Sequence, residues 1–326
     1  MNWTRERERG GAALRLMAWI ARTAGWHLSY ALLYPITAVF LATAPRAQRA
    51  AALRFHRRAL GREPGWRDLW RQYFTFAATL LDRVFLLSGR TRGFDIRVTG
   101  LDAIQARVSA GEGCILLGAH LGSFEAMRAL ADSGCPVEVM ALMHGQHAAN
   151  ANALFADLGP RQAAAVVSLG RPDAMLRAKE CLERGGLVGI LADRDPEGCK
   201  VARVDFLGAP APLPVGPFIL AGVLDAPVML AFGIWRGPRR YEVRFEPFAD
   251  RIVLDRRNRQ GALTAYAARY ATRLGELARA HPGNWFNFYE FWDDAPRSPE
   301  PEQQAVTREA VVPAARRGVA AEEPAA

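Results

Sequence analysis

The stretch from residue 94 to residue 192 alternates short apolar runs with longer amphipathic segments, and this rhythm constrains the fold more than any other feature. The apolar runs have strand character, and the segments between them have helical periodicity. Strand, helix and strand in this order are typical of a mixed, largely parallel sheet flanked by helices, an α/β fold. The expected strands are 94–98, 114–117, 137–143, 163–168 and 187–192, and the expected helices are 124–133, 148–158 and 172–184.

The segments on either side of this stretch differ from it in character. Residues 1–95 have mainly helical periodicity, whereas residues 295–326 consist of Pro, Glu, Ala and Arg with almost no large apolar side chain, a composition typical of disorder. We therefore predict an N-terminal helical region (1–95), an α/β domain (96–294) and a disordered tail (295–326). Beyond residue 193 the domain is expected to continue with a strand at 204–207, a helix at 214–224, an antiparallel pair at 228–235 and 241–245, and a helix at 262–280.

Residues 26–44 contain no formally charged side chain, and their length is close to the roughly 20 residues that cross a bilayer core. Trp26, Tyr30 and Tyr34 suit the headgroup level of a membrane. The long, mixed-charge segment before them argues against a cleaved signal peptide. Three interpretations stay open: a tilted membrane-spanning helix, an amphipathic helix in the interface, and a buried helical hairpin kinked at Pro35. We expect membrane association.

The chain carries a formal charge of +9 at pH 7, nearly all of it from arginine, since Lys179 and Lys200 are the only lysines. This charge favours an anionic partner such as nucleic acid, an acidic protein or a phospholipid surface. No zinc-finger spacing, RNP-type aromatic motif or helix-turn-helix signature accompanies the arginines, so we expect no nucleic-acid partner. The four cysteines form no CxxC pair and are expected to be reduced thiols.

The stretch GAHLGSFEAM (118–127) joins an expected strand to an expected helix. In an open α/β sheet, ligands bind where strands end and helices begin. Gly118 and Gly122 relieve crowding around His120, and Ser123 is a plausible N-cap of the helix. The cap places Glu125 in the first turn, where the helix dipole favours a carboxylate.

A carboxylate on one nitrogen of an imidazole fixes the tautomer and leaves the other nitrogen as a proton acceptor. Because His120 precedes the helix and Glu125 lies in its first turn, the two side chains can touch. The sequence therefore predicts a general base with its orienting carboxylate. The alternative is that His120 only ends a strand and that Glu125 contributes solubility, as is common for a pattern this short.

The surrounding segments resemble a known family. HLGSFE after an apolar strand is similar to the H-x4-D/E motif of the lysophospholipid acyltransferase superfamily. The ordered blocks resemble the late acyltransferases of lipid A biosynthesis, the HtrB-like lauroyl/myristoyl family, over about residues 10–294. One departure is Arg194, where that family usually has glutamine. The matching blocks are LLYP (32–35), LDRVFLL (81–87), LAD (191–193), VDFLG (204–208), PVG (214–216), DAPVML (225–230) and NWFNFYEFW (284–292).

The resemblance implies acyl transfer from an acyl carrier protein or coenzyme A thioester to a hydroxyl of a lipid or glycolipid, at the cytoplasmic face of the inner membrane. It implies a glycerolipid acyltransferase-like fold and no cofactor. His120 would take the acceptor proton, with Glu125 as its partner, and the oxyanion would need donors from backbone N–H groups or an arginine. The residues expected to line the substrate site are Asp193, Arg194, Ser123, Arg203 and His144.

Other signals are weaker. His144 and His147 could share a helical face, but no further ligand completes a metal site, so we expect none. Ser123 is not in a GxSxG elbow, and Cys114 is expected to be buried in a strand. A cluster at Arg236, Arg239, Arg240 and Arg244 is either a docking surface for an acidic partner or a solvated turn. A catalytically silent lipid or acyl-carrier binding protein and a thioesterase are the alternatives to an acyltransferase.

Overall fold

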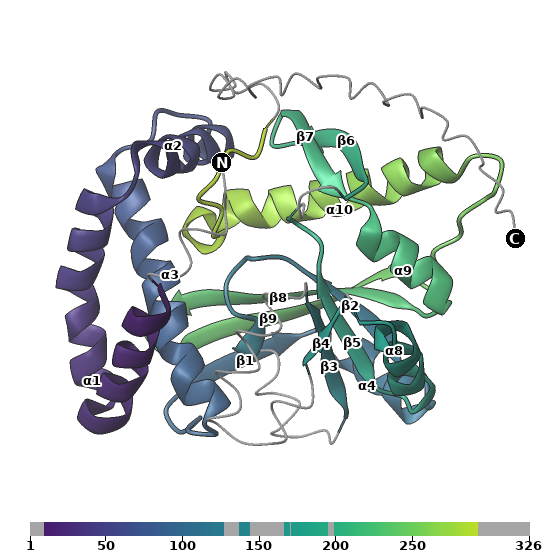
Figure 1. Cartoon of the computed structure of the whole chain (residues 1–326), viewed down its shortest axis with the longest axis horizontal. Coiled ribbons are helices and arrows are strands. Elements are labelled where there is room, and N and C mark those ends of the chain that lie inside the picture. The colour runs from purple at the N-terminus through teal and green to yellow at the C-terminus, as the bar shows by residue number, and fades with distance from the viewer. Residues whose placement is uncertain (1–9, 127–136, 144–165, 170, 195–198, 293–326) are drawn as a thin grey trace, which may run out of the picture. The chain divides into compact units, whose positions relative to one another are not determined.

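The computed structural model describes residues 10–126, 137–143, 166–169, 171–194 and 199–292 (Figure 1). The described residues belong to one compact unit, Met1–Asp293. The predicted tail, His144 and most of the two helices predicted at 124–133 and 148–158 lie outside them. The division at residue 95 stays a prediction.

A seven-stranded mixed sheet forms the centre of the fold, in the order β1-β9-β8-β2-β5-β3-β4. All neighbouring pairs are parallel except β8 and β9, which form an antiparallel hairpin. A separate antiparallel ribbon consists of β6 and β7. The strands are β1 (Asp95–Thr99), β2 (Cys114–Gly118), β3 (Val139–Met143), β4 (Val166–Ser168), β5 (Leu187–Leu191), β6 (Val201–Phe206), β7 (Ala209–Pro214), β8 (Val228–Gly237) and β9 (Arg240–Ala249).

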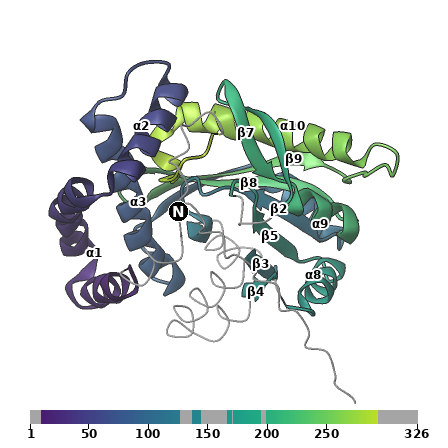
Figure 2. The same ribbon diagram turned by 45° about the horizontal axis from the view of Figure 1, so that its top comes forward.

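Helices cover both faces of the sheet because its central strands are apolar on both sides. β2, for example, is buried at every residue. One face packs against α8, α9, α10 and the β6–β7 ribbon, and the other against α4 and the end of α3 (Figures 1 and 2). The helices are α1 (Gly10–Thr43), α2 (Arg46–Leu60), α3 (Trp66–Leu87), α4 (Leu101–Ser109), α8 (Ala174–Glu183), α9 (Gly216–Leu224), α10 (Arg259–Ala280) and the 3-10 turn η1 (Pro282–Asn284).

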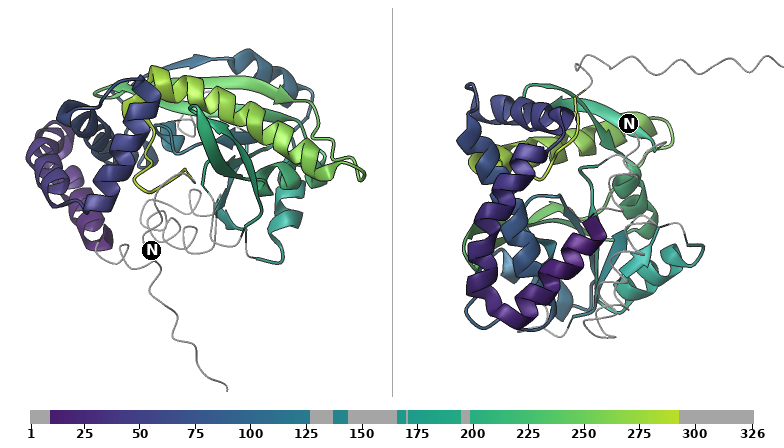
Figure 3. Two further views of the ribbon diagram at one scale, coloured as in Figure 1. Left: turned by 90° about the horizontal axis from the view of Figure 1, so that it is seen from above. Right: turned by 60° about the vertical axis from the view of Figure 1, so that its left-hand side comes forward.

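The apolar α1 packs along α3 (Figure 3, right). Trp26 and Leu33 are buried against Leu81 and neighbouring α3 residues. Val39 and Phe40, towards the end of α1, are 61% and 59% exposed. The stretch Gly25–Thr43 is long and apolar enough to cross a membrane, a test that a core helix also passes.

A buried carboxylate links α1 and α3 to the sheet. Asp82 on α3 accepts hydrogen bonds from Trp26 Nε1 at 2.6 Å and from the Tyr241 hydroxyl at 2.8 Å. The Arg239 guanidinium stacks 4.3 Å from the centre of the Trp26 ring. Burial raises the pKa of Asp82 to about 6, against the lowering effect of these hydrogen bonds and of the Arg239 charge.

The sequence-based expectations hold for the α/β class, the predicted strands and the β8–β9 hairpin. Of the three interpretations of residues 26–44, the hairpin kinked at Pro35 is wrong: the helix continues through Pro35, and the chain turns at Gly25, whose φ of 74° is outside the helical range. The strand β7 was not predicted, because its sequence APAPLP carries three prolines. The prolines are tolerated because β7 pairs only with β6, so one edge of the strand needs no backbone N–H for a ladder hydrogen bond.

Asp82 makes the stability of the fold pH-dependent. The pKa of Asp82 in the folded protein, about 6, lies above the reference value of 3.8. Its contribution to the free energy of unfolding is therefore full below pH 4 and is lost as the pH rises towards 6. The stability of the wild type relative to Asp82→Asn should therefore fall by about 2 kcal/mol between pH 4 and pH 7. Chemical unfolding at several pH values measures this difference.

The matched control is Asp225→Asn, at an exposed carboxylate paired with Arg251. Asp225 has a φ of 52°, which asparagine tolerates well. Its stability difference from the wild type should change little over the same pH range. A pH-independent difference for Asp82→Asn as well would contradict the assignment.

Candidate active site

Two adjacent parallel strands bring the central residues together. β2 and β5 pair in register, with Gly118 opposite Leu191 at their carboxyl ends. His120 follows β2 by two residues, and Asp193 follows β5 by two residues. The ends of parallel strands meet at one edge of the sheet, so the two side chains face each other across this edge.

The Asp193 carboxylate is 1% exposed and accepts three hydrogen bonds. Its Oδ1 lies 2.8 Å from His120 Nδ1. Its Oδ2 accepts from the His120 backbone N–H and from Trp285 Nε1, each at 2.9 Å. Burial raises the pKa of Asp193, but the His120 charge and hydrogen bond, the Arg194 charge and the Trp285 hydrogen bond together lower it to about 2.

An ionised Asp193 can only accept hydrogen bonds, so the facing Nδ1 of His120 must carry a proton. In the neutral ring, Nε2 then lacks a proton and is the basic nitrogen. The His120 side chain is 29% exposed, so substrate can reach it. The pair therefore has the chemistry of a general base with its orienting carboxylate.

The loop that carries His120 is held by backbone contacts on two sides. Ser123 N donates to Gly233 O on β8 at 2.7 Å, and Gly122 N donates to Asn284 O at 2.9 Å. Gly122 has a φ of 75°, and a Cβ there would lie 1.9 Å from the carbonyl oxygen of Gly233. Only glycine fits this position, which confirms the expectation that Gly122 relieves crowding.

Trp285 connects the site to the N-terminal helices. Its ring is buried among Phe55, Phe206 and other aromatic side chains, and its carbonyl accepts from Gln72 Nε2 at 2.7 Å. Gln72 Oε1 in turn lies 3.1 Å from His56 Nε2. Burial lowers the pKa of His56 to about 4, so its ring is neutral at pH 7. A chain of buried polar groups thus leads from α2 and α3 to Asp193.

Glu125 has a different set of partners from the one expected. Its carboxylate pairs with Arg83 on α3 at 2.7 Å and accepts from Ser123 Oγ at 3.2 Å. The acceptor on His120 Nδ1 is Asp193, a residue that the sequence assigned only to the substrate lining. Ser123 is confirmed as the helix cap, since its Oγ accepts from Ala126 N at 3.3 Å. A catalytic role for Glu125 stays a prediction.

The other predicted lining residues lie at different places. Arg194 follows Asp193 directly, and its Nη2 donates to the carbonyl of Phe286 at 2.8 Å. Arg203 is on the exposed side of β6, whose other side joins the core. His144 lies outside the described residues. Cys114 is buried in β2, and burial raises the pKa of its thiol to about 12, which suits a structural residue.

Sequence reasoning missed three residues that organise the site. Trp285 and Asn284 enter the sequence analysis only as members of the block 284–292, and Gln72 does not enter it. The sequence does contain a signal for Gln72 and Asn284, because each is an amide among apolar or aromatic residues. Gln72 is the one amide in α3, and Asn284 precedes an aromatic run. A polar side chain among apolar neighbours needs a hydrogen-bonding partner once it is buried.

Comparisons with known proteins bear on the family of the chain. A search of curated proteins finds no match. A family description, that of the bacterial lipid A biosynthesis acyltransferases, matches residues 77–293, which is more than half of the chain and includes His120, Asp193 and Trp285. The chain belongs to the bacterial lipid A biosynthesis acyltransferase family.

Proposed function

We propose that the protein transfers a fatty acyl group from an acyl carrier protein or coenzyme A thioester to a hydroxyl of a lipid or glycolipid. Membership of the family supports an acyltransferase. The contact that carries the mechanistic part is the 2.8 Å hydrogen bond between His120 Nδ1 and Asp193 Oδ1. It prepares Nε2 to act as a base at a partly exposed edge of the sheet.

In the proposed reaction, the acceptor hydroxyl gives its proton to His120 Nε2 as its oxygen attacks the thioester carbonyl. The carbonyl electrons move to the oxygen, giving a tetrahedral oxyanion. When this intermediate collapses, the carbon–sulfur bond breaks, the ester forms, and the departing thiolate takes the proton from Nε2. Asp193 stabilises the imidazolium between the two proton transfers.

Two further residues have proposed roles in this step. Arg194 carries a positive charge next to Asp193, and we assign it to the thioester or its oxyanion. Glu125, held by Arg83, adds a second negative charge on the helix that follows the His120 loop. We propose that Glu125 supports the protonated state of His120, whereas Asp193 sets its tautomer.

Replacing His120 with Ala tests the proposal. General-base catalysis contributes about 10²–10⁴-fold, so the variant should lose at least about 100-fold in kcat/KM. The assay follows a labelled acyl group from an acyl carrier protein thioester into extracted lipid. His27→Ala, at an exposed histidine of α1, is the matched control and should keep the activity.

Asp193→Asn in the same assay should lose more activity than Glu125→Gln, because Asp193 sets the tautomer. Wild-type-like transfer by His120→Ala would overturn the proposed base. Free fatty acid without acylated lipid would identify a thioesterase. Thioester binding with neither product would identify a silent carrier-binding protein.

We further propose that the protein lies on the cytoplasmic face of the inner membrane, with α1 in the interface. Support comes from exposed apolar side chains of α1, such as Val39 and Phe40. The helix α1 also packs along α3, which carries Asp82 and Arg83. A bilayer-spanning α1 would bring these charged groups to membrane depth, which is costly.

A charge at an exposed apolar position of α1 should weaken this attachment. Phe40→Glu should lower the fraction of protein that floats with vesicles of mixed anionic and neutral phospholipids, because a carboxylate replaces a ring in contact with lipid. Leu176→Glu on α8 is the matched control, since Leu176 and Phe40 are both 59% exposed. Equal loss for both variants, or for neither, would contradict attachment through α1.

A further inference from the structure

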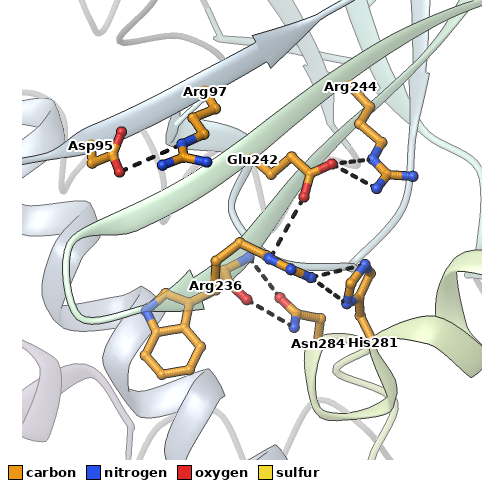
Figure 4. Close-up of polar contacts among 8 residues, drawn as sticks. Asp95, Arg97, Arg236, Glu242, Arg244, His281 and Asn284 are labelled. Carbon is orange, nitrogen blue, oxygen red and sulfur yellow. Dashed lines mark hydrogen bonds and ion pairs between the residues drawn. The ribbon is translucent and has the colours of Figure 1, made fainter.

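A group of charged residues lies at the carboxyl-terminal part of β8 and the facing part of β9, outside the His120–Asp193 pair (Figure 4). Glu242 on β9 holds two arginines. Its Oε1 accepts from Arg244 Nε at 2.7 Å, and its Oε2 lies 3.6 Å from Arg236 Nε. Arg236 Nη1 donates to Nδ1 of His281 at 3.1 Å. We call Arg236, Glu242, Arg244 and His281 the Arg236 cluster.

The cluster has more positive than negative charge. One carboxylate faces two guanidinium groups, and Arg71 on α3 approaches from the other side, where it packs on Gly283. Burial and the charges of Arg236, Arg244 and Arg71 lower the pKa of His281, against the effect of Glu242. The imidazole is therefore a neutral acceptor that holds Arg236 in place rather than a further cation.

The two arginines are ordered by their neighbours and still open to solvent. The side chains of Arg236 and Arg244 are 50% and 28% exposed. Glu242 contacts Nε and Nη2 of Arg244 at 2.7 and 2.6 Å and lies 3.6 Å from Nε of Arg236. A guanidinium has five N–H donors, so each arginine keeps donors beyond these contacts, and such donors suit a tetrahedral oxyanion with several acceptor oxygens.

A short path connects the cluster with the His120 loop. Asn284 lies three residues after His281, and its side chain bonds the backbone of Trp235, the neighbour of Arg236, at 2.8 Å and 3.2 Å. The carbonyl of the same Asn284 accepts from Gly122, two residues from His120. Asn284 therefore contacts both the backbone next to Arg236 and the loop that carries His120, at the same edge of the sheet.

We infer that the Arg236 cluster is a subsite for a phosphate group of the substrate. The inference rests on the proposed function, because it places a substrate phosphate beside the acyl-transfer site. That phosphate can belong to the pantetheine arm of the acyl donor or to the lipid acceptor. In either case, the two guanidinium groups bind the phosphate oxygens and place the reacting end of the molecule towards His120.

Equilibrium binding with matched probes tests the inference. The donor arm compares 4′-phosphopantetheine with pantetheine, which differs from it only by the missing phosphate. The acceptor arm compares phosphatidic acid with diacylglycerol in neutral detergent micelles. The wild type should bind a phosphorylated member more tightly, and the preference should decrease as salt is added.

The double variant Arg236→Gln/Arg244→Gln should weaken binding of the phosphorylated probe at least about tenfold, with little change for its phosphate-free partner. Arg251→Gln is the matched control, since Arg251 is an exposed arginine that is also paired with one carboxylate, Asp225. A tenfold loss for 4′-phosphopantetheine alone assigns the subsite to the donor. A loss for phosphatidic acid alone assigns it to the acceptor.

Equal affinities of the double variant and the Arg251→Gln control for both phosphorylated probes would overturn the inference. The result is independent of the base proposed for catalysis. His120→Ala should retain phosphate binding while it loses acyl transfer. If the wild type transfers no acyl group but the double variant still loses phosphate binding, the proposed reaction falls and the phosphate subsite stands.

Discussion

The buried carboxylate of Asp193 is the interaction on which the rest of the site depends. A carboxylate that is 1% exposed is unfavourable unless its oxygens are satisfied, and here three donors come from two distant parts of the chain. Two donors belong to His120 after β2, and one belongs to Trp285 after α10. The same bonds that make the burial of Asp193 tolerable therefore set the position and tautomer of His120.

Two buried polar links join the N-terminal helices to the sheet. Asp82 binds Trp26 of α1 and Tyr241 of β9, and Gln72 of α3 binds the carbonyl of Trp285. Each link satisfies a polar group that would be costly to bury alone. Because Trp285 also donates to Asp193, α3 supports the edge that carries His120 and Asp193 as well as α1. We therefore expect the proposed membrane-facing surface and the reacting residues to move together.

The sequence predicts the local parts of this arrangement well. The alternation of apolar runs places the strands, and GAHLGSFEAM places His120 at the end of one of them, with Ser123 as the helix cap. A spacing of five residues within one segment suggested Glu125 as the partner of His120. That inference used only local geometry, in which a carboxylate close in sequence is the natural candidate.

The residue on His120 Nδ1 depends on strand order, which local patterns do not encode. Asp193 is 73 residues away from His120, and it is near because β5 inserts next to β2 rather than at the end of the sheet. Trp285 reaches the site because α10 crosses over the sheet (Figure 3, left). The sequence does not predict the ribbon strand β7 for another reason: its prolines conflict with ordinary strand propensity.

The tautomer of His120 tests the central claim most directly. Nitrogen NMR of the protein labelled with ¹⁵N-histidine, assigned by comparison with His120→Ala and recorded where the ring is neutral, distinguishes the two ring nitrogens. The account predicts a proton on Nδ1 and none on Nε2, with this preference weakened in Asp193→Asn. A neutral His120 with its proton on Nε2 would contradict the account, because the nitrogen assigned as the base would already be occupied.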